Sequence, residues 1–141
     1  MPLFEERLNQ GHSVVFMPRG TSMLPMIHQG VDHVTLSPLP PELRKYDLPL
    51  YRRDNGQFVL HRILEAGDTY TCCGDNQFEM ECGIRPDQFI GLVTAFTRKG
   101  RTVSVEDPRY RFYCRFWHCT RPVRHFKRRV CGKLRRIFSH K

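Results

Sequence analysis

The sequence lacks any long apolar run. No stretch reaches the roughly 20 apolar residues that a membrane-spanning helix needs. The first ten residues, MPLFEERLNQ, contain two acidic residues and no apolar segment of the kind that marks a secretory signal. We therefore expect a protein that is cytoplasmic or peripheral at a membrane, without a signal peptide or a transmembrane segment.

The cysteines lack the spacing of a metal site or of a disulfide framework. None belongs to a Cys-x-x-Cys pair, and the adjacent Cys72 and Cys73 are poorly placed to bridge each other. We expect free thiols, a reducing compartment, no metal site and no cofactor. The six positions are Cys72, Cys73, Cys82, Cys114, Cys119 and Cys131.

Acidic residues are missing from the C-terminal part of the chain. Residues 109–141 carry 12 Lys and Arg and no Asp or Glu, whereas residues 1–108 carry 11 Lys and Arg and 14 Asp and Glu. The net charge is therefore +12 in the tail and −3 in the rest. Aromatic residues and arginines alternate in the tail at helical spacing. We predict a globular body at 1–108 and a basic amphipathic helical extension at 109–141, interrupted at Pro122.

Short segments separated by turn residues predict a mainly β fold in the body. A length of 141 residues favours one domain, and ten Pro and ten Gly punctuate it. Two strand-like runs flank residues 54–56 (DNG), a sequence that favours a tight hairpin. We expect about six or more strands after a short N-terminal helix. The expected helix is 3–10, and the expected strands are 13–17, 32–37, two around the hairpin, 69–73, 88–97 and 101–106.

Ser22 lies in a turn that is suited to nucleophilic chemistry. It follows a predicted strand, and Gly20 and Pro25 prevent any regular element around it. A backbone N–H held in such a turn can stabilise a developing oxyanion. A serine hydroxyl also needs a base, which has to come from another part of the chain.

His61 is the candidate base. It falls within residues 58–64 (FVLHRIL), where alternation puts it on the same side as Val59 and Ile63. Apolar surroundings lower the pKa of a histidine and keep it neutral, as a base requires. Asp75 follows one strand later and is a candidate to orient the imidazole. Arg62, beside His61, is either solvated or a local ion-pair partner.

These segments resemble a known family, in the same order. Residues 20–27 (GTSMLPMI) are similar to the nucleophile box of signal peptidase I and, more loosely, of LexA-like proteins. Residues 59–63 (VLHRI) resemble the second box, where bacterial members carry a lysine base; the histidine is similar to the endoplasmic-reticulum and archaeal type. Residues 74–76 (GDN) resemble the third box, and residues 89–93 (FIGLV) the strand that closes the sheet. The likeness covers about residues 12–98.

The resemblance implies a serine endopeptidase that cleaves an extended leader or signal-like peptide. The fold it implies is a LexA and signal-peptidase-like β fold at 1–108. Ser22, His61 and Asp75 would be catalytic, with Glu81 as the alternative acid because Glu79 and Glu81 stand where further aspartates are usual. The family's membrane anchor and the LexA DNA-binding domain have no counterpart. Oxyanion and substrate-binding positions are Gly20, Thr21 and Met23.

Other interpretations stay open. The chain is alternatively a non-catalytic peptide-binding or membrane-surface accessory protein of this fold, or a LexA-like self-cleaving regulator, although no scissile Ala-Gly or Cys-Gly precedes Ser22. For the tail, an anionic membrane surface is favoured because Trp117 and the neighbouring aromatics suit an interface. Nucleic acid is less favoured, and a solvated extension is the third possibility.

Overall fold

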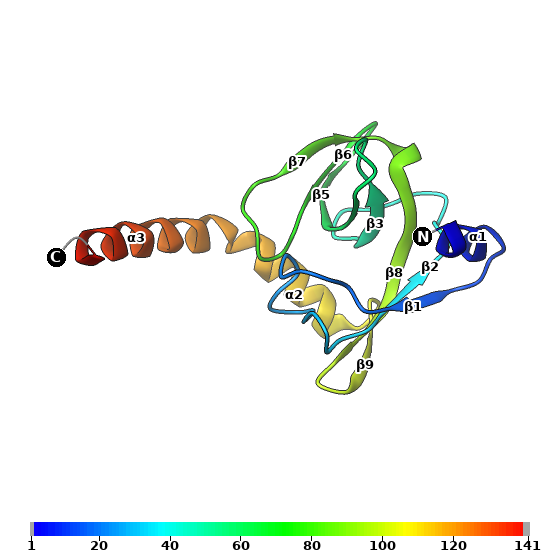
Figure 1. Cartoon of the computed structure of the whole chain (residues 1–141), viewed down its shortest axis with the longest axis horizontal. Helices are drawn as coiled ribbons and strands as arrows, with labels where there is room; N and C mark the ends of the chain where they lie inside the picture. The colour runs from blue at the N-terminus through cyan, green and yellow to red at the C-terminus, as the bar shows by residue number, and fades with distance from the viewer. Residues whose placement is uncertain (1, 140–141) are drawn as a thin grey trace.

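The computed structural model describes residues 2–139, with side chains for residues 3–131. Within these residues, nine strands form two antiparallel sheets, and helices lie at both ends of the chain (Figure 1). The prediction of a mainly β fold with a short N-terminal helix and C-terminal helices is confirmed. The helices are α1 (Pro2–Asn9), α2 (Pro108–Cys119) and α3 (Arg121–Ser139).

The larger sheet is organised around its longest strand, β8 (Phe89–Arg98). Its order is β1-β2-β8-β3-β4, and β9 also pairs with β8. Gly91 lets β2 pack closely against β8, because a Cβ at this position would lie 2.8 Å from Leu36 Cγ. The other strands are β1 (Val14–Phe16), β2 (Val34–Ser37), β3 (Pro49–Arg52), β4 (Phe58–Leu60) and β9 (Arg101–Ser104).

The smaller sheet consists of β5 (Arg62–Ala66), β6 (Tyr70–Cys73) and β7 (Glu81–Ile84). The predicted continuous strand 58–64 is wrong: β4 ends at Leu60 and pairs with β3, whereas β5 begins at Arg62 and pairs with β6. His61 therefore lies at the junction between the two sheets. A shared apolar core joins them, formed by Leu43, Tyr51, Val59, Ile63, Cys72, Ile84 and Phe89.

Helix α2 is part of the packed body. Asp107 caps it by accepting a 2.8 Å hydrogen bond from the Arg109 N–H. Tyr110 and Cys114 are buried in the main core with residues of α1, β2 and β8. The predicted boundary at 108 thus matches the start of a helix, but the packed body continues through α2. Helix α3 runs outward from it (Figure 1).

Three further findings concern the cysteines, metal binding and membrane spans of the described residues. All six cysteines are free thiols, as predicted. Among the described residues, no group of three or more His, Cys, Asp and Glu side chains is placed to hold a metal ion. No described helix combines the length and apolar character needed to cross a bilayer.

Candidate active site

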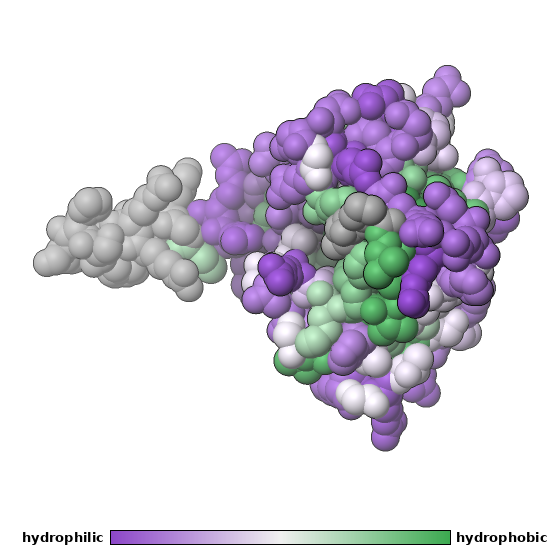
Figure 2. Space-filling view, turned by 45° about the vertical axis from the view of Figure 1, so that its right-hand side comes forward, coloured by the Kyte–Doolittle hydropathy of each residue, from purple (hydrophilic) through white to green (hydrophobic). Residues whose placement is uncertain are grey.

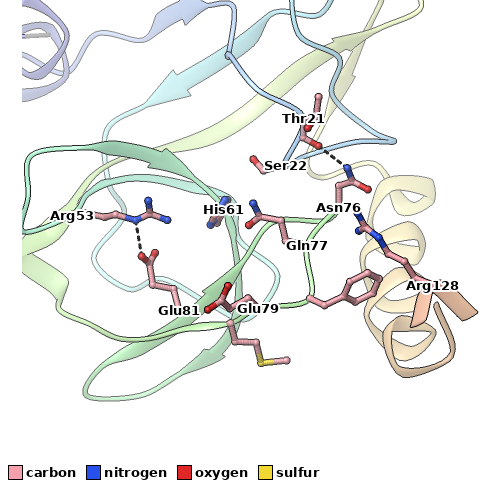
Figure 3. Close-up of a pocket in the computed structure, with 11 residues that line it drawn as sticks. Thr21, Ser22, Arg53, His61, Asn76, Gln77, Glu79, Glu81 and Arg128 are labelled. Atoms are coloured by element: carbon pink, nitrogen blue, oxygen red, sulfur yellow. Dashed lines mark hydrogen bonds and ion pairs between the residues drawn. The ribbon is translucent and has the colours of Figure 1, made fainter. Parts of the chain in front are cut away.

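A cleft of about 600 Å³ lies between the turn that carries Ser22, the β4–β5 junction and the segment that enters β7 (Figure 3). A smaller hollow of about 220 Å³ adjoins it, and Ser22 and His61 line both. The cleft is lined by Thr21, Ser22, Arg53, His61, Asn76, Gln77, Phe78, Glu79, Met80, Glu81 and Arg128.

The Ser22 turn is anchored from its C-terminal side. Met23 and Ile27 are buried in the main core, and the Ile27 N–H donates a 3.1 Å hydrogen bond to the Met23 carbonyl. Gly20 has a φ of +89°, which favours glycine, and its N–H donates to the Gln29 side chain. Of the predicted binding positions, Thr21 lines the cleft, whereas Gly20 and Met23 line the adjoining hollow.

The loop at residues 74–76 holds this turn in place. The Asn76 N–H donates to the Ser22 carbonyl at 2.8 Å, and its side-chain amide donates to the Thr21 carbonyl at 3.1 Å. Gly74 is packed so closely that a Cβ would lie 2.6 Å from the Ser22 carbonyl oxygen and 3.0 Å from its Cβ. The loop at residues 74–76 thus positions the Ser22 backbone directly.

Replacing Gly74 with alanine should displace the Ser22 turn. The added methyl group has no free space, so we expect about 1–3 kcal/mol of destabilisation together with a large loss of any Ser22-dependent activity. Gly67→Ala is the matched control, because the nearest atom to its Cβ is the Thr69 carbonyl oxygen at 3.7 Å. Urea unfolding and activity assays of both variants test this; equal behaviour would contradict the clamp.

His61 is buried, with only 6% of its surface exposed. Its pKa is lowered to about 4, mainly by burial; Arg53 also lowers this pKa, whereas Glu81 and Asp75 oppose the shift. The imidazole is therefore neutral near pH 7. The direction of this shift agrees with the expectation of a neutral histidine, although the charged side chains of Arg53, Glu81 and Asp75 also act on the ring.

Tyr51 connects His61 to an acid. Its hydroxyl donates to a Glu81 carboxylate oxygen and lies 3.4 Å from His61 Nδ1. The Tyr51 hydroxyl already donates its proton to Glu81, so it can only accept from His61. We therefore assign the His61 proton to Nδ1, from which it is donated toward the Tyr51 oxygen. The lone pair then resides on Nε2. Arg53 fixes the other Glu81 oxygen, with Nε at 2.6 Å.

Asp75 has a different role from the one predicted. Both of its carboxylate oxygens are taken by Arg62, with Nε at 2.8 Å and Nη2 at 2.9 Å, and the Tyr113 hydroxyl donates at 3.0 Å. It makes no hydrogen bond with His61 among the contacts described for residues 3–131. The pair is buried, with side chains 2% and 0% exposed. Asp75 therefore holds the 74–76 loop, and Glu81, the alternative acid, is the one linked to His61.

Ser22 and His61 face the same cleft without a direct bond. Neither the Ser22 hydroxyl nor its backbone N–H has a hydrogen-bond partner among the described residues. Nucleophile–base bonds often tighten only when substrate is bound. Ser22 and His61 are therefore joined, among the described residues, only by lining the same cleft.

Several residues of the site were not predicted. Tyr51 could have been found from the sequence. The hairpin at 54–56 pairs it with Val59, and His61, two residues after Val59, lies on the same face. Tyr113 and Trp117 have none, because they reach Asp75 from α2, far along the chain. Trp117 Nε1 donates to the Asp75 carbonyl at 2.7 Å.

Comparison with known proteins finds no family model, no curated protein and no solved structure that matches this chain. The geometry of the cleft and the resemblance of residues 20–27, 59–63 and 74–76 are therefore the observations that bear on function.

Proposed function

We propose that this chain is a serine endopeptidase in which Ser22 is the nucleophile and His61 the base. The observation that carries the proposal is that these two residues, from separate elements, line one cleft, and that the histidine is buried and neutral. The resemblance of both segments to signal peptidase I of the Ser–His type supports the same assignment.

The proposed reaction gives Ser22 Oγ and His61 Nε2 the roles of nucleophile and base. Ser22 Oγ attacks the substrate carbonyl carbon while its proton passes to His61 Nε2. The proton is then returned to the leaving amine, and an acyl-enzyme remains. Water, deprotonated by the same nitrogen, releases the second product. Tyr51 and Glu81 hold the Nδ1 side of the ring throughout.

The surroundings suit an extended peptide. Strand β4 is an edge of the larger sheet and leads directly to His61, so its free edge can pair with a peptide strand. The 220 Å³ hollow beside Ser22 is bordered partly by apolar residues, including Met23, Ile27 and Val59. We propose that this hollow receives a small substrate side chain next to the scissile bond.

A second candidate is a non-catalytic peptide-binding protein of the same fold. It is favoured by the absence, among the described residues, of a Ser22–His61 hydrogen bond. A diverse peptide library incubated with the full chain separates the two candidates by mass spectrometry. New termini at defined positions support the peptidase, whereas retained but intact peptides support the binding protein.

The pH dependence of cleavage reports the state of His61. The base is active when neutral, so kcat/KM should fall only as the pH drops through about 4. At pH 5, about nine-tenths of the rate at pH 7 should persist, whereas a histidine with an ordinary pKa of about 6.5 would leave roughly 4% of it. A fall to that lower value by pH 5 would contradict the buried, neutral base.

Tyr51→Phe removes the hydroxyl between His61 and Glu81 and retains the aromatic ring. We expect kcat to fall about tenfold or more because the ring loses its orienting partner, with little change in KM. Tyr70→Phe is the control, since Tyr70 packs on the same Phe89 ring without contacting His61. Equal kcat values for both variants would rule out the Tyr51 link.

A further inference from the structure

Helices α2 and α3 behave as one bent helical rod. The Thr120 N–H donates to the Phe116 carbonyl at 3.0 Å, and the Arg124 N–H donates to the Thr120 carbonyl at 3.0 Å. Thr120 is the C-cap of α2, but its φ of −89° and ψ of −1° stay in the right-handed region. The two bonds flank the junction on either side, and positions along both helices can therefore be compared approximately, at about 100° per residue.

One side of this rod faces the body. Tyr110, Cys114 and Arg121 are buried, at 6%, 3% and 5% exposed. Trp117 donates to the Asp75 carbonyl, and Arg128 lines the cleft. At about 100° per residue, these five positions share one face.

The opposite side carries an exposed apolar stripe. The spacing of its members alternates between four and three residues, apart from the gap at Cys119, which is itself exposed. Their mean direction is about 180° from the body-facing side. The Phe112 and Phe116 rings stack with centroids 6.0 Å apart. The stripe consists of Phe112, Phe116, Val123, Phe126 and Val130, which are 40–70% exposed.

Basic residues flank this stripe on both sides. Arg115 and Arg129 lie on one side and Arg109 and Lys127 on the other, each about 60–100° from its middle. Among the described residues, no carboxylate lies within salt-bridge distance of these four. Residues 109–141 contain no acid at all.

We propose that the stripe docks the protein on an anionic membrane surface. Apolar side chains enter the interface while flanking Arg and Lys extend to the lipid headgroups, which is the pattern of an interfacial helix. A second copy is a poor occupant, because pairing two stripes would bring together two +12 tails without a single acid. A nucleic acid would contact the basic residues but would leave the phenylalanine side chains of the stripe exposed to water.

Membrane docking would orient the body. The body-facing side of the rod, including Arg128 at the cleft, would lie about one helix diameter, roughly 10 Å, from the lipid. Peptides emerging from the membrane surface would thus be within reach of the cleft. The docking itself does not depend on peptidase activity.

Vesicle co-sedimentation of the full chain tests the proposal. The probe vesicles contain phosphatidylcholine alone or with about 30% phosphatidylserine. We expect binding to the anionic vesicles, at least about tenfold weaker binding to the neutral ones, and weakening by salt. The double variant Phe116→Ser/Phe126→Ser should lose at least about tenfold in affinity, with an unchanged circular dichroism spectrum.

The control replaces two equally exposed residues elsewhere, Leu3→Ser/Val15→Ser. Figure 2 shows hydrophobic surface on the side of the body where α1 and β1 lie, and this variant tests that side. Equal losses in both variants, or no anionic preference, would overturn the proposal. The proposal would also be overturned if the wild-type protein were a dimer that bound no lipid and the phenylalanine variant were a monomer. Tighter binding of the wild-type protein to a 20-base-pair DNA duplex than to anionic vesicles would overturn it as well.

Discussion

Replacing Ser22 with alanine is expected to lower kcat/KM for peptide cleavage at least about 10³-fold. The change removes the attacking oxygen, and binding and the oxyanion donor alone leave only a small residual rate. Since the Ser22 side chain has no hydrogen-bond partner among the described residues, the free energy of unfolding should change by less than about 0.5 kcal/mol. Cleavage kinetics and urea unfolding of the same preparation measure both.

Ser13→Ala is the matched control for that experiment. Ser13 is an exposed serine that contacts Ser37 and lies outside the cleft. Its replacement should leave kcat/KM unchanged. If Ser22→Ala retained cleavage within tenfold of wild type while Ser13→Ala did the same, the nucleophile would have to be another residue.

The largest effect on stability is expected at the buried Arg62–Asp75 pair. Asp75→Asn leaves the Arg62 guanidinium buried without a counter-charge, and such a loss destabilises a protein by about 3–5 kcal/mol. Arg62→Met should cost a similar amount. The double variant should be more stable than the sum of the single losses predicts, because neither charge is then left alone.

An exposed pair with the same shortest N···O distance provides the control. Arg85 Nη2 lies 2.8 Å from Asp54 Oδ1, the same separation as Arg62 Nε and Asp75 Oδ1, but both side chains are about half exposed or more. Asp54→Asn should leave urea unfolding nearly unchanged. A change of less than about 1 kcal/mol in the free energy of unfolding for Asp75→Asn would contradict the claim that this pair stabilises the site. Strictly additive changes in the double variant would contradict it as well.

The Arg62–Asp75 pair also links the segment after His61 to the loop at residues 74–76. Arg62 follows His61 directly, and Asp75 lies between Gly74 and Asn76, which hold the Ser22 turn. The ion pair therefore connects the start of β5, next to His61, to the loop that holds the Ser22 turn. Asp75→Asn should reduce activity as well as stability, even though Asp75 does not touch the imidazole.

Local patterns predicted much of the fold. The hairpin at 54–56, the turn between β5 and β6, and the long strand β8 all follow from alternation and turn residues near one another in sequence. Strand β7 was missed because ECGI offers neither alternation nor β-branched residues before its end. The break at His61 was missed because it depends on which sheet each neighbour joins, and this is a long-range property.

The site also combines residues that local sequence predicts with roles that depend on long-range contacts. Ser22 and His61 were predicted from their own segments, and the structure places them on one cleft. The role of Asp75 was not predictable from spacing, because Arg62 competes for its carboxylate and Tyr113 approaches from α2. A boundary drawn from charge at residue 108 likewise concealed that α2 completes the core.

Active-site labelling tests the central claim most directly. A fluorophosphonate reacts with a serine only when a neighbouring base activates it. Mass spectrometry of the labelled full chain should locate the adduct on Ser22, and His61→Ala should reduce the labelling rate at least about 100-fold. Labelling of a different serine, or a rate at Ser22 that is unaffected by His61→Ala, would contradict the account.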